Sequence, residues 1–400
     1  MIWLWSIITG NMNLILMLSV FLWSNSLSKE YSIELLEEII DNRYTDDSLE
    51  NFIKIQSDWE RYKIEFEKQY NSPDEELKRM KTYMDNSKLI EKHNDLFQRG
   101  VYTYELGHNE FSDLSDEEYQ ELYSQDPIQE GDNYPTIETT YHERPLNFDL
   151  SSLVDAVDDS SLIDDNSSSN EELSPSFARH IQDGKPPFSI DWRKLGGVTP
   201  VKTEGSCGAH WAFSATGSLE GQIFRKFHRL VSLSEQNLID CAGKKYHNNG
   251  CKNGTALNAF KYVIKNKGID TNLTYPYKGK QQWFCKYKKL PTNPQVHGVL
   301  VLPRGNETNL AAVIAKSGPV SVAIDATGNK FRFYIRGVYN NPHCNSVRLT
   351  REMTVVGYAP NYFILKNSWG HKWGLSGYML LGRTGHNQCG VATRAVLPLV

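Results

Sequence analysis

The six cysteines of this 400-residue chain all lie between residues 207 and 389, so a disulfide framework can cross-link only the C-terminal half. They are Cys207, Cys241, Cys251, Cys285, Cys344 and Cys389. An even number of cysteines behind a signal-like segment is typical of a disulfide-linked domain. We therefore expect three disulfides in one large folded domain, preceded by an ancillary segment.

The first 28 residues have the pattern of a secretory signal peptide. Residues 14–23 form an apolar run that small polar residues follow, and the run is too short to cross a membrane comfortably. An uncleaved anchor is the alternative, because no Lys or Arg precedes the run. Four N-x-S/T sequons fit an exported glycoprotein, and they begin at Asn166, Asn253, Asn272 and Asn306. We expect a secreted or endolysosomal protein.

Charge divides the chain into two parts. Residues 1–185 carry 15 basic and 39 acidic side chains, whereas residues 186–400 carry 28 basic and 9 acidic ones. The net charge of −5 therefore conceals two segments that attract each other. A domain this basic is expected to attract polyanions such as sulfated glycans, nucleic acid or anionic membrane surfaces, and a surface neutralised by the chain's own acidic segment is the alternative. No specific nucleic-acid motif is present.

The N-terminal part has two regions of different composition. Residues 35–123 are charged and helical in pattern, and Leu77, Met80, Met84 and Ile90 recur near the spacing of an amphipathic helix. Residues 124–185 are acidic and serine-rich, and they hold too few apolar side chains to order themselves. We expect a helical domain at 35–123 and a flexible linker, open to proteolysis, at 124–185.

Residues 186–400 have the composition of a packed α+β domain, with helices early and strands late. The runs VSVAI, MTVVGY, YFILKNSWG and GYMLL are typical of strands between glycine turns. A helix is expected from residue 210, where apolar residues recur every four positions. They are Trp211, Ala215, Leu219, Ile223 and Phe227. The loop before this helix would aim the side chain of His210 out of its N-terminus.

Several motifs of this domain resemble the papain family of cysteine peptidases, and more narrowly its cathepsin L-like branch. They are SIDWRKLGGVTPVK, GSCGxxWAFSATGSLEGQ, LSEQNLIDC, GCKNG, VVGYAPNYFILKNSWG and GYMLL, in the family's order and spacing. The resemblance covers roughly residues 59–400. It implies a papain-like two-lobed α+β fold with a helical left lobe and a β-barrel-like right lobe.

The N-terminal part is similar to the family's inhibitory propeptide, a helical unit that lies through the cleft of the mature domain. The pattern E-x3-R-x3-F-x2-N-x3-I-x3-N is matched, with Tyr for Phe, by Glu75, Arg79, Tyr83, Asn86, Ile90 and Asn94, and Gly107, Asn109, Phe111 and Asp113 follow it. The family resemblance also implies three disulfide pairs. They are Cys207 with Cys251, Cys241 with Cys285, and Cys344 with Cys389.

Family catalysis needs a thiolate at a helix N-terminus, an imidazole base, an amide that orients the ring, and an oxyanion hole. Aligned by the surrounding motifs, the nucleophile's position holds His210 and the base's position holds Arg351. The oxyanion amide is replaced by Glu204, and only the orienting amide remains, as Asn367. The resemblance therefore implies that three of four polar catalytic positions are changed.

These changes predict a loss of peptide cleavage. An imidazole lacks the nucleophilicity of a thiolate, and a guanidinium stays protonated at physiological pH and so cannot act as a general base. A carboxylate in the oxyanion hole would repel the developing charge. We expect a binding or decoy protein. A cysteine-type peptidase or hydrolase that uses unrecognised chemistry is the alternative, for which the sequence offers no nucleophile.

The replacement residues have two main interpretations. Glu204 and Arg351 could form a substitute ion pair across the cleft, with a neutral His210 hydrogen-bonded within that pair. Neutral drift in a site that is no longer selected is the other interpretation. A metal site of His210 with His371 has little support, because no ligand spacing is present. A sequence error would explain one change but hardly three. We expect no cofactor and no metal.

The cleft keeps part of the family's substrate-binding residues. Gly254 remains in the glycine stretch that aligns the substrate backbone, and Trp369 covers the orienting amide. Asn253 replaces a glycine and begins a sequon, so a glycan there would obstruct long peptides unless the sequon is unoccupied. We expect a monomer whose partners are its own propeptide and either peptides, peptidase inhibitors or polyanions.

Overall fold

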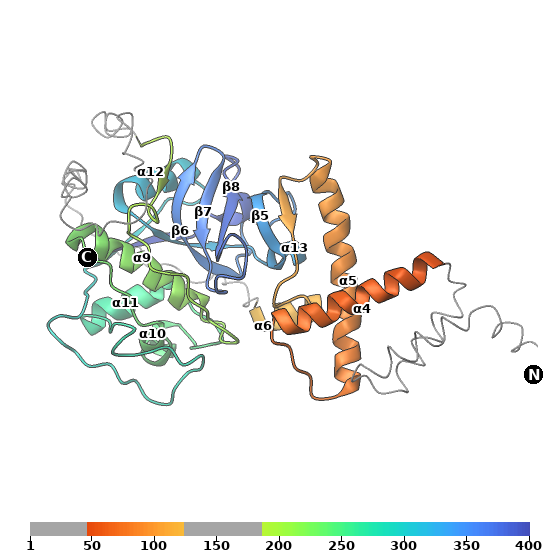
Figure 1. The fold of residues 1–400 in the computed structure, drawn as a ribbon. Coiled ribbons are helices and arrows are strands. Elements are labelled where there is room, and N and C mark those ends of the chain that lie inside the picture. The colour runs from red at the N-terminus through yellow and green to blue at the C-terminus, as the bar shows by residue number, and fades with distance from the viewer. Residues whose placement is uncertain (1–45, 124–185) are drawn as a thin grey trace, which may run out of the picture. The chain divides into compact units, whose positions relative to one another are not determined.

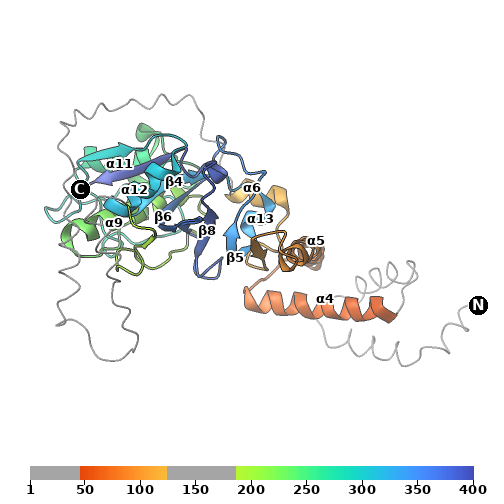
Figure 2. The ribbon, with the colours of Figure 1, turned by 90° about the horizontal axis from the view of Figure 1, so that it is seen from above.

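The computed structural model describes residues 46–123 and 186–400, shown as coloured ribbons in Figures 1 and 2. The expected signal peptide at 1–28, the linker at 124–185 and the sequon at Asn166 lie outside the described residues. The chain divides into two compact units. The first ends at Leu89 and includes Ser112–Leu114, and the second comprises Ile90–Phe111 and Ser115–Val400. No helix within the described ranges is both long and apolar enough to traverse a bilayer.

The first unit contains α4 (Asp46–Glu65) and the N-terminal part of α5 (Pro73–Gln98). Its core holds the buried side chains of Trp59, Tyr62, Met80 and Tyr83. Asp113 closes this core, because its carboxylate accepts hydrogen bonds from the hydroxyl of Tyr62 and from Nζ of Lys68, both at 2.8 Å. The long amphipathic helix expected from the sequence is α5, in which Met80 and Ile90 are buried.

Helices of the second unit come early in the peptidase-like part, as expected. They are α9 (His210–Phe227), α10 (Glu235–Cys241) and α11 (Ala256–Asn266), with the short η1 (Lys244–Tyr246) between the last two. In both ribbon views α9 and α11 lie to one side of β5, β6 and β8 (Figures 1 and 2). The side chains of Trp211, Ala215, Leu219 and Ile223 are buried. Phe227 was expected in the same stripe but is 59% exposed, because α9 ends there with His228 in a left-handed conformation.

The strands form one sheet in the order β1-β5-β8-β7-β6-β4-β9-β3, and β2 also pairs with β6. Their bounds are β1 (Tyr104–Leu106), β2 (Ile190–Asp191), β3 (Gly298–Val301), β4 (Val320–Ile324), β5 (Tyr334–Tyr339), β6 (Arg351–Ala359), β7 (Tyr362–Lys366), β8 (Tyr378–Gly382) and β9 (Ala395–Leu399). All ladders are antiparallel except that of β5 with β8. The α+β class is confirmed, although the expected barrel-like lobe is an open sheet.

The remaining helices that lie wholly in the second unit come before or between the strands in the chain. They are α6 (Asp116–Tyr123), α12 (Glu307–Ser317), α13 (Asn329–Arg332) and the short η2 (Gln388–Gly390). Strand β6 matters most for the site, because it lies inside the sheet between β4 and β7 and its first eight residues are buried. Any side chain at its first positions is therefore held in the protein interior.

The three disulfides implied by the family resemblance are all formed. Cys207 is bonded to Cys251, Cys241 to Cys285, and Cys344 to Cys389, which leaves no free thiol. The first of these bonds joins the loop before α9 to the segment before α11. It therefore helps to hold the residues that precede His210.

Candidate active site

Helix α9 presents His210 as its first residue, and this side chain is only 1% exposed. The preceding Ala209 offers no side-chain cap for the helix. The loop places His210 at the N-terminus of α9, as expected, but the side chain is buried because this end of the helix packs against β6. Nδ1 of His210 accepts a hydrogen bond from the backbone amide of Glu352 at 3.0 Å.

The contact with Glu352 determines which tautomer His210 adopts. Because Nδ1 is the acceptor, the proton of the neutral ring lies on Nε2. Among the described residues Nε2 has no hydrogen-bond partner. Burial, and after it the charge of Arg351, lowers the pKa of His210 well below its ordinary value. The N-terminal end of the helix dipole also disfavours a cation, so the ring is neutral at physiological pH.

Arg351 is the first residue of β6 and has no exposed surface. Its Nε donates to Oδ1 of Asn367 and its Nη2 donates to Oγ of Ser368, both at 3.0 Å. Nη2 also forms an ion pair with Glu204. The ion pair proposed from the sequence is therefore present, but His210 is not hydrogen-bonded within it as expected, because its acceptor nitrogen is directed to the amide of Glu352.

Glu204 is completely buried and is held on both sides by backbone contacts. Its amide donates to the carbonyl of Ser368 at 2.8 Å, and its own carbonyl accepts from the hydroxyl of Tyr277 at 2.7 Å. Burial raises the pKa of Glu204, and the guanidinium of Arg351 opposes that rise. A fully buried guanidinium needs a counter-charge, and the carboxylate in contact with it is that of Glu204.

Trp369 covers the guanidinium of Arg351 and links the site to residues from the N-terminal part of the second unit. The guanidinium carbon lies 4.1 Å from the centroid of the indole ring, within the range of a cation–π contact. The rings of Phe111 and Tyr119 pack edge-on against the same indole, with centroids 4.7 and 6.0 Å away. Trp369 therefore joins the guanidinium of Arg351 to the rings of Phe111 and Tyr119.

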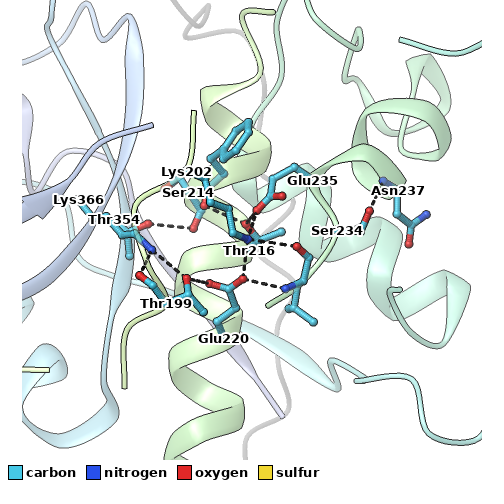
Figure 3. Close-up of polar contacts among 12 residues, drawn as sticks. Thr199, Lys202, Ser214, Thr216, Glu220, Ser234, Glu235, Asn237, Thr354 and Lys366 are labelled. Carbon is cyan, nitrogen blue, oxygen red and sulfur yellow. Dashed lines mark hydrogen bonds and ion pairs between the residues drawn. The ribbon is translucent and has the colours of Figure 1, made fainter. Parts of the chain in front are cut away.

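Figure 3 shows a buried polar cluster. Several of its residues line the same small pocket as His210. Nζ of Lys202 contacts Oε1 of Glu220 at 2.9 Å and Oε1 of Glu235 at 2.6 Å. Nζ of Lys366 donates to the carbonyl and the hydroxyl of Thr199, at 2.7 and 2.9 Å. The hydroxyl of Thr199 in turn donates to Oε2 of Glu220 at 2.6 Å. These contacts connect α9, α10, β7 and the loop before α9.

The charges of this cluster balance one another. Burial raises the pKa of Glu220. The charges of Lys202 and then of Lys366 lower it by more than burial raises it, so the net shift is downward. Burial lowers the pKa of Lys366 to about 8, and Glu220 opposes that change. The cluster therefore joins separate elements with paired charges.

The space beside His210 is small. The pocket there has a volume of about 20 Å³, which is room for about one water molecule. It is lined by His210, Ser214, Glu352 and Asn367, together with residues of the polar cluster. Ser214 closes one side, because its hydroxyl contacts that of Ser321 at 2.6 Å and donates to the carbonyl of Met353 at 2.7 Å. Protein atoms therefore occupy most of the space around the ring.

Glu352 is a site residue that the sequence analysis missed. Its carboxylate is buried, and Oε2 accepts a hydrogen bond from the backbone amide of Ala256, the first residue of α11, at 2.7 Å. Burial raises the pKa of Glu352 to about 8, and the Ala256 contact and Arg394 oppose the rise. The signal available in the sequence was an acidic residue inside the apolar run of a strand, in LTREMTVVGY.

Two of the expected cleft residues differ in exposure. Gly254 is buried, and a Cβ there would lie 2.7 Å from the indole ring of Trp211, so only glycine fits without a shift. Asn253 is exposed. The hydroxyl of Thr255, the last residue of its sequon, accepts a hydrogen bond from the amide of Asn258 at 3.2 Å at the start of α11.

His371 is exposed, and within 46–123 and 186–400 no group of three or more His, Cys, Asp or Glu residues is placed to hold a metal.

Comparison with protein-family models gives two matches. A model described as papain family cysteine protease matches residues 186–399. A model described as cathepsin propeptide inhibitor domain (I29) matches residues 59–119. Together these two matches cover most of the residues that the structure describes.

Curated relatives and solved structures are similar along most of the chain. Cathepsin L of Sarcophaga peregrina is 40% identical over 351 residues, which are 86% of this chain and 93% of that protein. Digestive cysteine proteinase 1 of Homarus americanus is 36% identical over 86% of this chain and 94% of its own length. The structure of digestive procathepsin L2 proteinase from Tenebrio molitor larval midgut matches with a TM-score of 0.70 at 32% identity, over 86% of this chain and all of that one.

Proposed function

The chain belongs to the papain family of cysteine peptidases, and from that premise we propose that this member binds partners on the family scaffold without cleaving peptides. The observation that carries the proposal is the state of Arg351. At the position where the family holds its imidazole base, this chain has a fully buried guanidinium in contact with Glu204. Such a group keeps its proton at physiological pH and cannot take one from a nucleophile.

His210 does not supply a replacement nucleophile. A neutral imidazole has one nitrogen lone pair available for attack, and in His210 that lone pair belongs to Nδ1. Nδ1 already accepts the amide hydrogen of Glu352. Nε2 carries the single N–H proton of the neutral ring. The adjoining pocket has room for about one water molecule. We infer that neither nitrogen of the ring attacks a peptide carbonyl.

The oxyanion position leads to the same conclusion. Family catalysis stabilises a negative oxygen with donors that point toward it. Glu204 stands at the position of the amide donor in the aligned motif, and its carboxylate only accepts hydrogen bonds when ionised. The pairing of Glu204 with Arg351 gives the site an internal charge balance, which is why we favour a substitute ion pair over neutral drift.

The chain's own propeptide is the partner best supported by contacts. Within the second unit, β1 pairs with β5, and the ring of Phe111 packs on Trp369. Asp116 forms a 2.6 Å ion pair with Arg332, whose side chain is fully buried. We propose that these residues keep the propeptide bound, and that any processing depends on a different peptidase acting between residues 124 and 185.

Export and glycosylation complete the proposal. Three formed disulfides fit an oxidising compartment, which agrees with the expected signal peptide and with a secreted or endolysosomal location. The exposed Asn253 is available for a glycan that would stand over a substrate-binding position. Peptide mass spectrometry of the native protein tests this assignment, and an unmodified Asn253 would remove it.

The decisive experiment measures turnover of a fluorogenic peptide together with labelling by a thiol-directed epoxide. We expect neither from the native chain, before or after cleavage of an engineered protease site between residues 124 and 185. The matched positive control is the triple variant Glu204→Gln, His210→Cys, Arg351→His, which returns the family's residues to all three positions. Peptide turnover by the native chain that disappears in His210→Ala would show instead a hydrolase with unrecognised chemistry.

A further inference from the structure

The long connection between α11 and β3 carries the two most exposed aromatic side chains of the described residues. Trp283 is 96% exposed and the neighbouring Phe284 is 77% exposed. Figure 1 shows this connection in teal at the lower left, outside α10 and α11. Large aromatic rings are seldom left in water side by side, and such a patch commonly marks a binding surface.

Basic residues precede and follow the two aromatic residues in the sequence. Five exposed lysines lie within residues 278–289, and they are Lys278, Lys280, Lys286, Lys288 and Lys289. No acidic residue occurs from 271 to 306. Asp270 accepts a hydrogen bond from the backbone amide of Lys288. Asp240 also contacts the segment, and both its oxygens are occupied. Oδ1 accepts from the amide of Gln282 at 2.7 Å, and Oδ2 accepts from the hydroxyl of Tyr275 at 2.7 Å.

The backbone on both sides of the aromatic pair is held in place. Before the pair, the side chain of Gln236 accepts from the amide of Lys278 at 2.7 Å and donates to the carbonyl of Lys280 at 2.9 Å. After the pair, Cys285 is bonded to Cys241, and the amide of Lys286 donates to the hydroxyl of Tyr275 at 3.1 Å. The rings are therefore exposed from an anchored frame, which lowers the entropic cost of binding.

We propose that residues 278–289 dock on the surface of an anionic lipid bilayer. Trp283 and Phe284 enter the headgroup region, where aromatic rings are favoured, and the lysines contact acidic headgroups. A soluble polyanion would pair with the lysines but leave both rings in water, whereas a bilayer surface accommodates both features. This inference does not depend on the loss of peptide cleavage.

The test is cosedimentation of the full chain with vesicles of phosphatidylcholine, with or without about 30% phosphatidylserine. We expect binding to the anionic vesicles only, and weaker binding at high salt because the charges are exposed. The double variant Trp283→Ala, Phe284→Ala should lower the partition coefficient at least about tenfold. The variant Lys280→Glu, Lys286→Glu, Lys288→Glu should lower it about a hundredfold.

The matched control is Phe188→Ala, because Phe188 is 76% exposed but residues 186–190 carry no charge. It should bind as the native chain does, and all variants should keep the native melting temperature. Brominated lipid should quench part of the tryptophan fluorescence, and Trp283→Phe should abolish that part.

Three results would overturn the proposal. One is a native chain that does not bind the anionic vesicles, including the case in which its own acidic residues 124–185 occupy the lysines. Another is an aromatic double variant that binds as well as the native chain. The third is retention on heparin that the lysine variant loses while vesicle binding is absent, which would identify a soluble polyanion as the partner.

Discussion

The backbone amide of Glu352 donates a 3.0 Å hydrogen bond to Nδ1 of His210, which joins the second residue of β6 to the first residue of α9. This contact sets the tautomer of the ring and occupies its lone pair. In the second unit it makes His210 part of the packing between helix and sheet. Its consequence for stability can be measured.

Replacement of His210 by alanine should destabilise the chain without changing peptide turnover. The amide of Glu352 would be left buried without an acceptor, which costs about 1–3 kcal/mol, and the lost ring leaves a cavity that adds to this. Chemical denaturation measures the difference. The control is His371→Ala at an exposed position, expected within about 0.5 kcal/mol of the native chain. Equal stabilities for the two variants would contradict a structural role for His210.

The ion pair of Glu204 with Arg351 should be strongly coupled. Removing one charge leaves the other buried and unpaired, so Glu204→Gln or Arg351→Met alone should cost about 3–5 kcal/mol. The double variant should be more stable than the sum of the single losses implies, and a double-mutant cycle measures the coupling.

Asp85→Asn is the matched control for this cycle, because Asp85 pairs with Lys88 at the surface, where both side chains are more than two-thirds exposed. That change should alter stability by less than about 1 kcal/mol. Additive losses in the Glu204 and Arg351 variants would rule out a compensating pair and favour neutral drift.

Glu352 should make the chain less stable as the pH rises. Its pKa in the folded chain is raised to about 8 from an ordinary value of 4.5, so between these values the folded state holds a proton that the unfolded state has released. The stabilisation is fully present below pH 4.5 and is lost as the pH rises through 8. The full shift corresponds to about 5 kcal/mol as an upper bound.

The variant Glu352→Gln isolates this effect, because it keeps an oxygen acceptor for the amide of Ala256 but cannot titrate. Melting temperatures of both proteins are compared from pH 5 to pH 8. We expect the native chain to lose stability over this range relative to the variant. Parallel curves would mean that Glu352 is ionised throughout.

The propeptide should stay bound after the chain is cut. With an engineered protease site between residues 124 and 185, the two fragments should elute together in size-exclusion chromatography. Phe111→Ala with Asp116→Asn removes the ring on Trp369 and the carboxylate on Arg332, and should release the N-terminal fragment at lower denaturant concentration. The control is Asp95→Asn, at an exposed helical pair with Arg99. Immediate separation of the native fragments would contradict the proposed retention.

Local pattern was enough to predict the elements that surround the site. The four-residue spacing from Trp211 predicted α9, and the run VSVAI predicted β4 with the observed bounds. The disulfide pairs and the positions of Glu204, His210 and Arg351 followed from the order of motifs that resemble one family. These features depend on residues close together in the chain or on spacing, both of which a sequence records.

Packing between distant segments determined the rest. Phe227 fits the stripe of α9 but is exposed, because the helix ends at that residue. His210 begins α9 as the pattern predicted, but its side chain is buried, and its partner Glu352 lies 142 residues away in the chain. The order of motifs in the sequence predicted that Arg351 and His210 stand where the family keeps its base and its nucleophile. The tertiary structure decided that both are buried, because the desolvation of each side chain, and therefore its charge state and partner, depends on how α9 packs against β6.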